Sequence, residues 1–181
     1  GMQQHPQGAA RLDQIERIVI ETCQAGVRII DKTGPLANYA DRDHCIQYMV
    51  AVPLIFGRLV ADDYGDEVAA DPRIDALRER MAVVENPDFT RDYFDPGRRY
   101  IGNAVQVFFN DGTCTEKVSI DYPLGHRRRR ADGIPSLMAK FEQAIFARLP
   151  EAQASQVLEL AALPEALEAM RLPAFMALFR T

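Results

Sequence analysis

The segment "YIGNAVQVFFNDGTCTEKVSIDYP", residues 100–123, decides the fold class of this chain. Apolar residues alternate with other residues on both sides of the "NDG" at residues 110–112. The alternating positions are Val105, Val107 and Phe109 before the turn, and Val118, Ile120 and Tyr122 after it. A period of two predicts strands, and Asn-Asp-Gly between two such runs predicts a tight turn. The segment therefore predicts a β-hairpin and, with it, an antiparallel sheet.

Two further segments predict strands. "DQIERIVIET", residues 13–22, alternates in the same way, and residues 25–31 are expected to continue this strand after a bulge at its glycine. "AVVEN", residues 82–86, is a short apolar run between polar segments. The segments 32–43 and 87–99 are rich in turn residues, so both are expected to be loops.

Helices are predicted in three regions. Within residues 61–81, a polar connection leads to a short amphipathic helix with Asp71 as its cap and Pro72 at its first position. Residues 43–59 are apolar over most of a helical surface, which is typical of a buried helix, and Pro53 is expected to kink or split it. Residues 134–148 predict an amphipathic helix. Its side chains expected to face inward are Leu137, Met138, Phe141 and Ile145.

The end of the chain completes the predicted architecture. Residues 151–179 predict two or three short helices, broken at Pro164 and Pro173. Helices with one apolar side must cover a sheet or one another. For residues 12–181 we therefore expect an α+β fold, a two-layer sandwich whose antiparallel sheet is covered by helices, with a short helical C-terminal tail.

The composition narrows the class of protein. The 181 residues are 48% hydrophobic with a net charge of −5, which fits one globular domain and argues against a nucleic-acid binder. No run reaches about 18 consecutive apolar residues, so no membrane-spanning helix is expected. The N-terminus lacks the apolar run of a signal peptide, so a cytoplasmic protein is expected. Residues 1–11 are expected to be a disordered leader, with Gly1 as a cloning scar.

The three cysteines predict no metal or cofactor site. Cys23, Cys45 and Cys114 are far apart, with no C-x-x-C pair. Metal ions and iron–sulfur clusters need several ligands that converge on one point. We therefore expect reduced, structural thiols, and neither a metal nor another cofactor.

The segment "DRDHCIQY", residues 41–48, carries the first candidate site. His44, Gln47 and Tyr48 are spaced i, i+3 and i+4, which places all three on one face of a helix near its N-terminus. With Arg42, these groups could bind a carboxylate and move a proton. The alternative is a capped helix whose first turn packs its polar groups against a neighbour.

Two other segments carry weaker candidates. "GHRRRR", residues 125–130, could hold a phosphate, a polyanionic substrate or an acidic partner, or it could be a solvated surface loop. Four arginines without interleaved aromatic residues are a weak signal for nucleic acid. Lys32 offers a mobile cation in "DKTGPLAN", residues 31–38, which could equally be an ordinary connection.

Longer motifs add a family resemblance. The chain contains, in this order, "ERIVIET", "RIIDKTGPLAN", "ADRDHCIQYMVAVPLIFGRL", "DPRIDALRERM", "NDGT", "YPLGHRRRR" and "GIPSLMAKF". Their order and spacing resemble the C-terminal domain of the MmgE/PrpD family of 2-methylcitrate dehydratases, from about Leu12 to Phe179. The family's H-x-x-Q-Y element is His44, Gln47 and Tyr48 in this chain.

The resemblance implies a reaction and site residues. The family's hydro-lyases dehydrate 2-methylcitrate to 2-methyl-cis-aconitate in the methylcitrate cycle of propionate catabolism, without an iron–sulfur cluster. Elimination needs a base for the C–H, an acid for the departing hydroxyl and cations for the carboxylates. The resemblance thus implies Tyr48 and His44 as catalytic candidates, and Gln47, Arg42, Lys32 and His126 as substrate-binding candidates.

The resemblance also implies that the site is incomplete. Family members carry a large helical domain before this one, and the 181 residues do not include it. The isolated chain is therefore expected to be inactive, with a small polycarboxylate, a second copy or the helical domain as its partners. Neither a nucleic acid nor a membrane is expected. The alternative function is a stand-alone polycarboxylate-binding or dimerisation module from a truncated gene.

Overall fold

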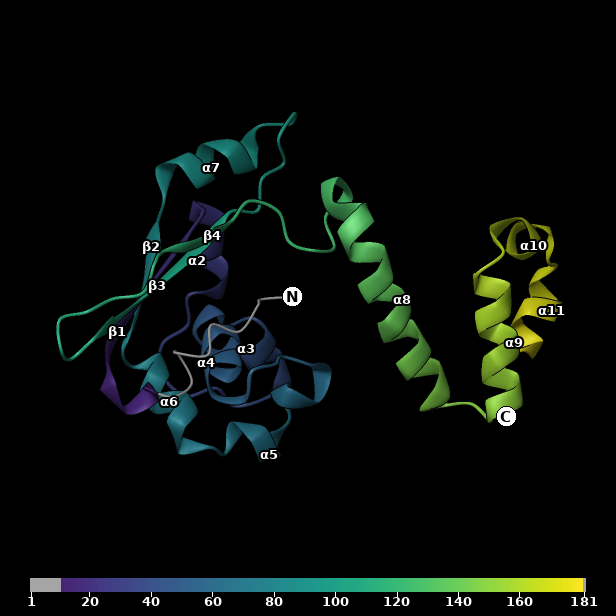
Figure 1. Ribbon diagram of the computed structural model, residues 1–181, viewed down its shortest axis with the longest axis horizontal. Helices are drawn as coiled ribbons and strands as arrows, with labels where there is room; N and C mark the ends of the chain where they lie inside the picture. Colours follow the sequence, from purple (N-terminus) through teal and green to yellow (C-terminus); the bar gives the residue numbers. More distant parts are fainter. Residues whose placement is uncertain (1–10, 181) are drawn as a thin grey trace. The chain divides into compact units, whose positions relative to one another are not determined.

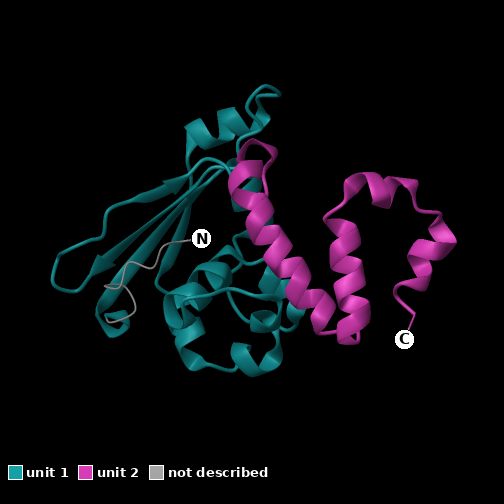
Figure 2. Cartoon of the chain, turned by 45° about the vertical axis from the view of Figure 1, so that its right-hand side comes forward, with its two compact units in different colours: residues 1–123 teal, residues 124–181 magenta. Residues whose placement is uncertain are grey.

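The computed structural model describes residues 11–180. The chain divides into two compact units, residues 1–123 (unit 1) and residues 124–181 (unit 2), coloured separately in Figure 2. The expected leader lies outside the described residues except for Arg11, which pairs with Asp111 at 2.5 Å. Among residues 11–180, no helix is both long and apolar enough to cross a bilayer.

Unit 1 is built on a four-stranded sheet with the order β2-β1-β3-β4 (Figure 1). The strands are β1 (Ile15–Thr22), β2 (Met81–Glu85), β3 (Asn103–Phe109) and β4 (Val118–Ile120). β3 pairs antiparallel with β1 and with β4, whereas β1 and β2 pair in parallel. The sheet is therefore mixed, not antiparallel throughout, because a long helical connection between β1 and β2 lets both strands run in the same direction.

The predicted hairpin is confirmed in β3 and β4. Val105 pairs with Val118, and the Phe109 N–H donates to the Thr113 C=O at 2.9 Å. Gly112 has a φ of +79°, in the left-handed region that favours glycine. Asp111 Oδ1 accepts from the Thr113 hydroxyl at 2.6 Å and from its N–H at 2.9 Å. The hydroxyl bond is the main reason why the pKa of Asp111 falls to about 2.

The core of unit 1 lies between one face of the sheet and helices α4 (Ile46–Phe56) and α6 (Pro72–Arg78). Ile18 and Ile20 of β1 are 0% and 1% exposed, and burial of each such side chain contributes about 1.5–3 kcal/mol. A sheet with helices on its apolar face confirms the predicted α+β class. The same cluster of buried residues includes Tyr48, Ala51, Val52, Ile74, Leu77, Val107 and Phe109.

Two segments that were expected to be a strand and a loop are helical. Residues 25–31, predicted to continue β1, lie largely in α2 (Gln24–Ile30), since pairing with β2 ends at Thr22. The predicted loop 87–99 begins with α7 (Pro87–Phe94), because Asn86 caps the helix and a proline opens it.

The helix predicted over residues 43–59 begins only at Ile46, as α4, and the end of the predicted loop 32–43 forms a separate helix. α3 (Tyr39–Asp43) ends before Cys45, whose backbone is extended (φ −122°, ψ 108°) and which precedes α4. α4 continues through Pro53, so the helix is not split there. Gly57 ends it with a φ of +71°. The break between α3 and α4 decides which of the predicted site residues meet.

Unit 2 is helical, with the 3₁₀ turn η3 (Arg127–Arg129) and helices α8 (Arg130–Phe146), α9 (Glu151–Ala161), α10 (Pro164–Ala169) and α11 (Leu172–Ala177). The last three helices confirm the predicted tail, and each proline lies at the first or second position of its helix. Leu137 and Met138 were expected to face inward, but they are 63% and 39% exposed. The other two side chains expected to face inward, Phe141 and Ile145, are partly buried, and the buried side chains described in this unit are those of Ala154 and Val157 in α9.

Candidate functional site: a pocket at Arg42 and Tyr48

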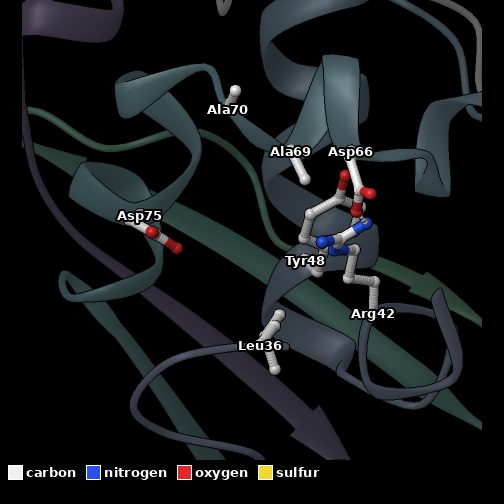
Figure 3. Close-up of a pocket in the computed structure, with 7 residues that line it drawn as sticks. All are labelled: Leu36, Arg42, Tyr48, Asp66, Ala69, Ala70 and Asp75. Carbon is white, nitrogen blue, oxygen red and sulfur yellow. Dashed lines mark ion pairs between the residues drawn. The ribbon is translucent and has the colours of Figure 1, made fainter. Parts of the chain in front are cut away.

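Unit 1 contains a pocket of about 300 Å³ next to the core (Figure 3). Its walls come from the loop before α3, from α3 and α4, from α5 (Asp66–Ala69) with the residue that follows it, and from α6. The break between α3 and α4 lets Arg42 and Tyr48 reach the same space from different helices. The lining residues are Leu36, Arg42, Tyr48, Asp66, Ala69, Ala70 and Asp75.

Arg42 supplies a buried cation to this pocket. Its side chain is 7% exposed, and its Nη1 donates to the Tyr64 C=O at 2.8 Å and pairs with Asp66 Oδ1 at 2.7 Å. Its Nε is buried without a hydrogen-bond partner among the described residues. A buried guanidinium with spare donor capacity is suited to binding a carboxylate.

Tyr48 forms the wall beside Arg42 and is fixed in place. It is 2% exposed, and its hydroxyl donates to the Asp63 C=O at 2.7 Å. Its ring stacks on Tyr64 with the centroids 5.8 Å apart. Burial raises the pKa of Tyr48, so the phenol is neutral at physiological pH and is a hydrogen-bond donor there.

Asp63 holds the segment that contacts Tyr48. Its carboxylate is fully buried and accepts from Arg58 Nη2 at 2.9 Å and from the Val60 N–H at 2.8 Å. The hydrogen bond from Arg58 is the main reason why the pKa of Asp63 lies below its usual value. The Tyr48 hydroxyl thus donates to the main-chain carbonyl of Asp63, a residue whose side chain is fixed by an ion pair with Arg58.

Gln47 and Lys32 lie together but outside the pocket lining. Gln47 is 3% exposed, its Nε2 donates to Asp31 Oδ1 at 2.5 Å, and its Oε1 accepts from the Lys32 N–H at 3.3 Å. Lys32 Nζ pairs with Asp41 at 3.4 Å. Both ends of the Gln47 amide are therefore engaged in holding the chain before α3.

Neither of the two predicted histidines is among the residues that line the pocket. His44 is the C-cap of α3, and its exposed ring pairs with Asp43 at 2.5 Å. The prediction that His44, Gln47 and Tyr48 share one helical face is wrong, because the chain breaks at Cys45. His126 lies in unit 2, where its Nδ1 accepts from the Arg128 N–H at 3.2 Å.

Comparison with known proteins gives the family. The sequence model of the MmgE/PrpD C-terminal domain matches residues 2–163. The chain belongs to the MmgE/PrpD family. It is 57% identical over 156 residues to a 2-methylcitrate dehydratase of Cupriavidus necator, a match that covers 86% of this chain and 32% of that protein.

Two more relatives of this MmgE/PrpD domain are also named 2-methylcitrate dehydratases. Identity is 56% over 146 residues both to the mitochondrial 2-methylcitrate dehydratase of Yarrowia lipolytica and to the 2-methylcitrate dehydratase of Escherichia coli K12. The matches cover 81% of this chain, and 28% and 30% of those proteins. The chain thus spans about 30% of the length of the curated relatives it matches.

Sequence reasoning missed the acidic side of the pocket in this MmgE/PrpD domain. Asp66 and Asp75 both line it, and Asp75 pairs with the buried Arg78 at 2.5 Å. Arg78 Nη2 also donates to the Gly34 C=O at 2.9 Å. The i, i+3 spacing of Asp75 and Arg78 on a predicted helix was a usable signal. No local spacing links Asp66 to Arg42.

Metal ligation has no support within residues 11–180, where no three His, Cys, Asp or Glu side chains come close enough to share an ion. The MmgE/PrpD pocket offers a buried guanidinium beside a neutral phenol. Such a pair is suited to binding an anionic oxygen and donating a hydrogen bond to it.

Proposed function

We propose that this chain supplies the C-terminal part of a 2-methylcitrate dehydratase, which removes water from 2-methylcitrate to give 2-methyl-cis-aconitate. One observation carries the proposal. Proteins that are 56–57% identical over more than 80% of this chain are named 2-methylcitrate dehydratases. The pocket adds a physical reason, because a buried arginine beside a neutral tyrosine suits a small polycarboxylate.

The reaction assigns different tasks to the groups around the substrate. A base takes the proton from carbon, the C–O bond breaks, and the hydroxyl leaves as water after it receives a proton. In this proposal Arg42 binds one carboxylate. Tyr48 donates a hydrogen bond or a proton to the substrate once its hydrogen bond to Asp63 is exchanged.

The remaining tasks fall to groups outside this pocket. Three carboxylates and a departing hydroxyl need more cations and a base than Arg42 and Tyr48 provide. We propose that the part of the enzyme outside this chain supplies them, with Lys32, His44 and His126 as weaker candidates from within it. The isolated chain is then inactive.

A chimera tests the proposed function. In the Cupriavidus necator relative, the matching part of this chain replaces the 156 residues it aligns with, and enoate absorbance follows the dehydration of 2-methylcitrate. The chimera is expected to turn over, the isolated chain is not, and Tyr48→Phe in the chimera lowers kcat/KM by about 10²-fold. Tyr39→Phe is the matched control, since Tyr39 lies outside the pocket lining. A folded but inert chimera, or an active isolated chain, contradicts the proposal.

A dimerisation module is the second candidate, favoured by exposed apolar side chains in unit 2. Leu137, Leu163 and Leu172 are 63%, 59% and 70% exposed, and a second copy of the chain is the simplest cover for them. Sedimentation equilibrium on the isolated chain tests this candidate. A monomer at all concentrations removes it.

A further inference from the structure

We propose that Asp66 is an internal carboxylate that occupies the anion site at Arg42, and that a carboxylate of the bound ligand displaces it. This inference rests on the proposed function, because it concerns how the same pocket selects a polycarboxylate. It assigns Asp66 a role in specificity, as a group that competes with the ligand for one guanidinium.

The two partners of this ion pair are unequal in burial. Arg42 is 7% exposed, whereas the Asp66 side chain is 92% exposed. The Asp66 carboxylate is therefore almost fully hydrated already, and it loses little when it moves into solvent. Arg42 has no such freedom, because a buried cation without a negative partner is strongly disfavoured.

The contact between them is also incomplete. It joins Asp66 Oδ1 to Nη1 of Arg42 at 2.7 Å, and the same Nη1 donates to the Tyr64 C=O. The buried Nε has no partner among the described residues. A carboxylate that meets the planar guanidinium with both oxygens makes a stronger contact than this single one.

The pocket has the space and the charge for such an exchange. Its volume of about 300 Å³ is bounded by the small side chains of Ala69 and Ala70. The second lining carboxylate, Asp75, is paired with Arg78 at 2.5 Å, so its charge is already balanced. When Asp66 swings out, the buried charge that remains unbalanced is that of Arg42. Only an anionic ligand restores the balance, so neutral analogues are excluded.

The exchange is tested by titrating the full chain with citrate, a tricarboxylate probe, and following its binding by ¹H–¹⁵N NMR. Asp66→Asn removes the competing charge and is expected to tighten citrate binding by about 3- to 10-fold, with the largest shifts around the pocket. Glu67→Gln is the matched control, because it removes one charge from the adjacent exposed position of α5, outside the pocket lining. Its citrate affinity is expected to stay within about twofold of the unmodified chain.

Three results would overturn the inference: equal tightening in both variants, no tightening in Asp66→Asn, or no citrate binding to a folded Asp66→Asn chain. Unchanged amide spectra outside the pocket verify that each variant is folded. Arg42→Lys, which keeps the charge but loses the planar fork, should weaken binding in the Asp66→Asn background. These are binding measurements on the isolated chain. An inert chimera would contradict the proposed function and leave their outcome unaffected.

Discussion

The Tyr48 hydroxyl donates a hydrogen bond to the main-chain carbonyl of Asp63 at 2.7 Å. One contact thereby joins the core helix α4 to the short 3₁₀ helix η2 (Ala61–Tyr64), on which Arg42 also depends through the Tyr64 carbonyl. The phenol proposed to meet the substrate therefore also has a structural task. Loss of activity in a Tyr48 variant must be separated from loss of stability.

Removing the Tyr48 hydroxyl should destabilise the fold measurably. Tyr48→Phe leaves the Asp63 carbonyl without this buried donor, and the free energy of unfolding is expected to fall by about 1–2 kcal/mol. Urea denaturation of the chain measures it. Tyr39→Phe is the control, since the Tyr39 hydroxyl donates to the Ala61 carbonyl from a residue that is 47% exposed. If Tyr48→Phe is as stable as the unmodified chain, the hydrogen bond from the Tyr48 hydroxyl to Asp63 does not stabilise the fold, and this prediction is wrong.

The buried Asp63 should make the domain sensitive to acid. Its ion pair with Arg58 places the folded-state pKa below the unfolded value of about 3.9. Stability from this carboxylate is therefore fully present above about pH 4, and it is lost as the pH falls through the lower, folded-state pKa. Asp63→Asn is expected to cost about 2 kcal/mol at pH 7 and to flatten the acid limb of the stability curve.

Asp62→Asn provides the control for this pH series, because Asp62 is the exposed neighbour of Asp63 in the same 3₁₀ helix. Its unfolding free energy should follow that of the unmodified chain from pH 7 to pH 3. If Asp63→Asn keeps the full acid dependence, the Arg58 pair is not its source.

The ionisation of Tyr100 should be shifted to an unusually alkaline pH. Burial, with a hydrogen bond from its hydroxyl to Asp121, raises the pKa of Tyr100 to about 12. Because the folded value exceeds the unfolded value of about 10, the neutral phenol stabilises the fold at lower pH, and this contribution is lost as the pH rises from 10 to 12. Absorbance titration of the phenolate should show a late transition that Tyr100→Phe removes. Substitution of the exposed Tyr93 should leave that transition in place.

The parts of the fold that local pattern controls could be predicted from the sequence. The hairpin follows from period-two alternation around Asn110, and the inward positions of Ile18 and Ile20 follow from the same period. The direction of β2 could not be predicted, because a short apolar run pairs either way and the preceding connection decides it.

The candidate site, like the fold, could be predicted from the sequence only in part. Arg42 and Tyr48 were predicted as site residues and line the same pocket, although Arg42 lies in α3, a helix within the segment that was predicted to be a loop. His44 was placed with them by helical spacing, and the extended backbone at Cys45 removes it from that face. Asp66 reaches Arg42 across 24 positions of sequence, so no periodicity could have linked the two.

Gln47 provides a test that separates a residue that holds a loop in position from a residue that contacts the substrate. Both ends of its amide are engaged, with Asp31 and with the Lys32 main chain, so we expect it to hold the 31–36 loop rather than to touch substrate. Gln47→Leu leaves the Lys32 N–H without that acceptor and should lower the free energy of unfolding by about 1–3 kcal/mol. In the chimera, the fraction of folded enzyme should fall while KM for 2-methylcitrate stays within about twofold. A large rise in KM in a fully folded Gln47→Leu chimera would instead make Gln47 a substrate ligand, which requires its amide to leave Asp31.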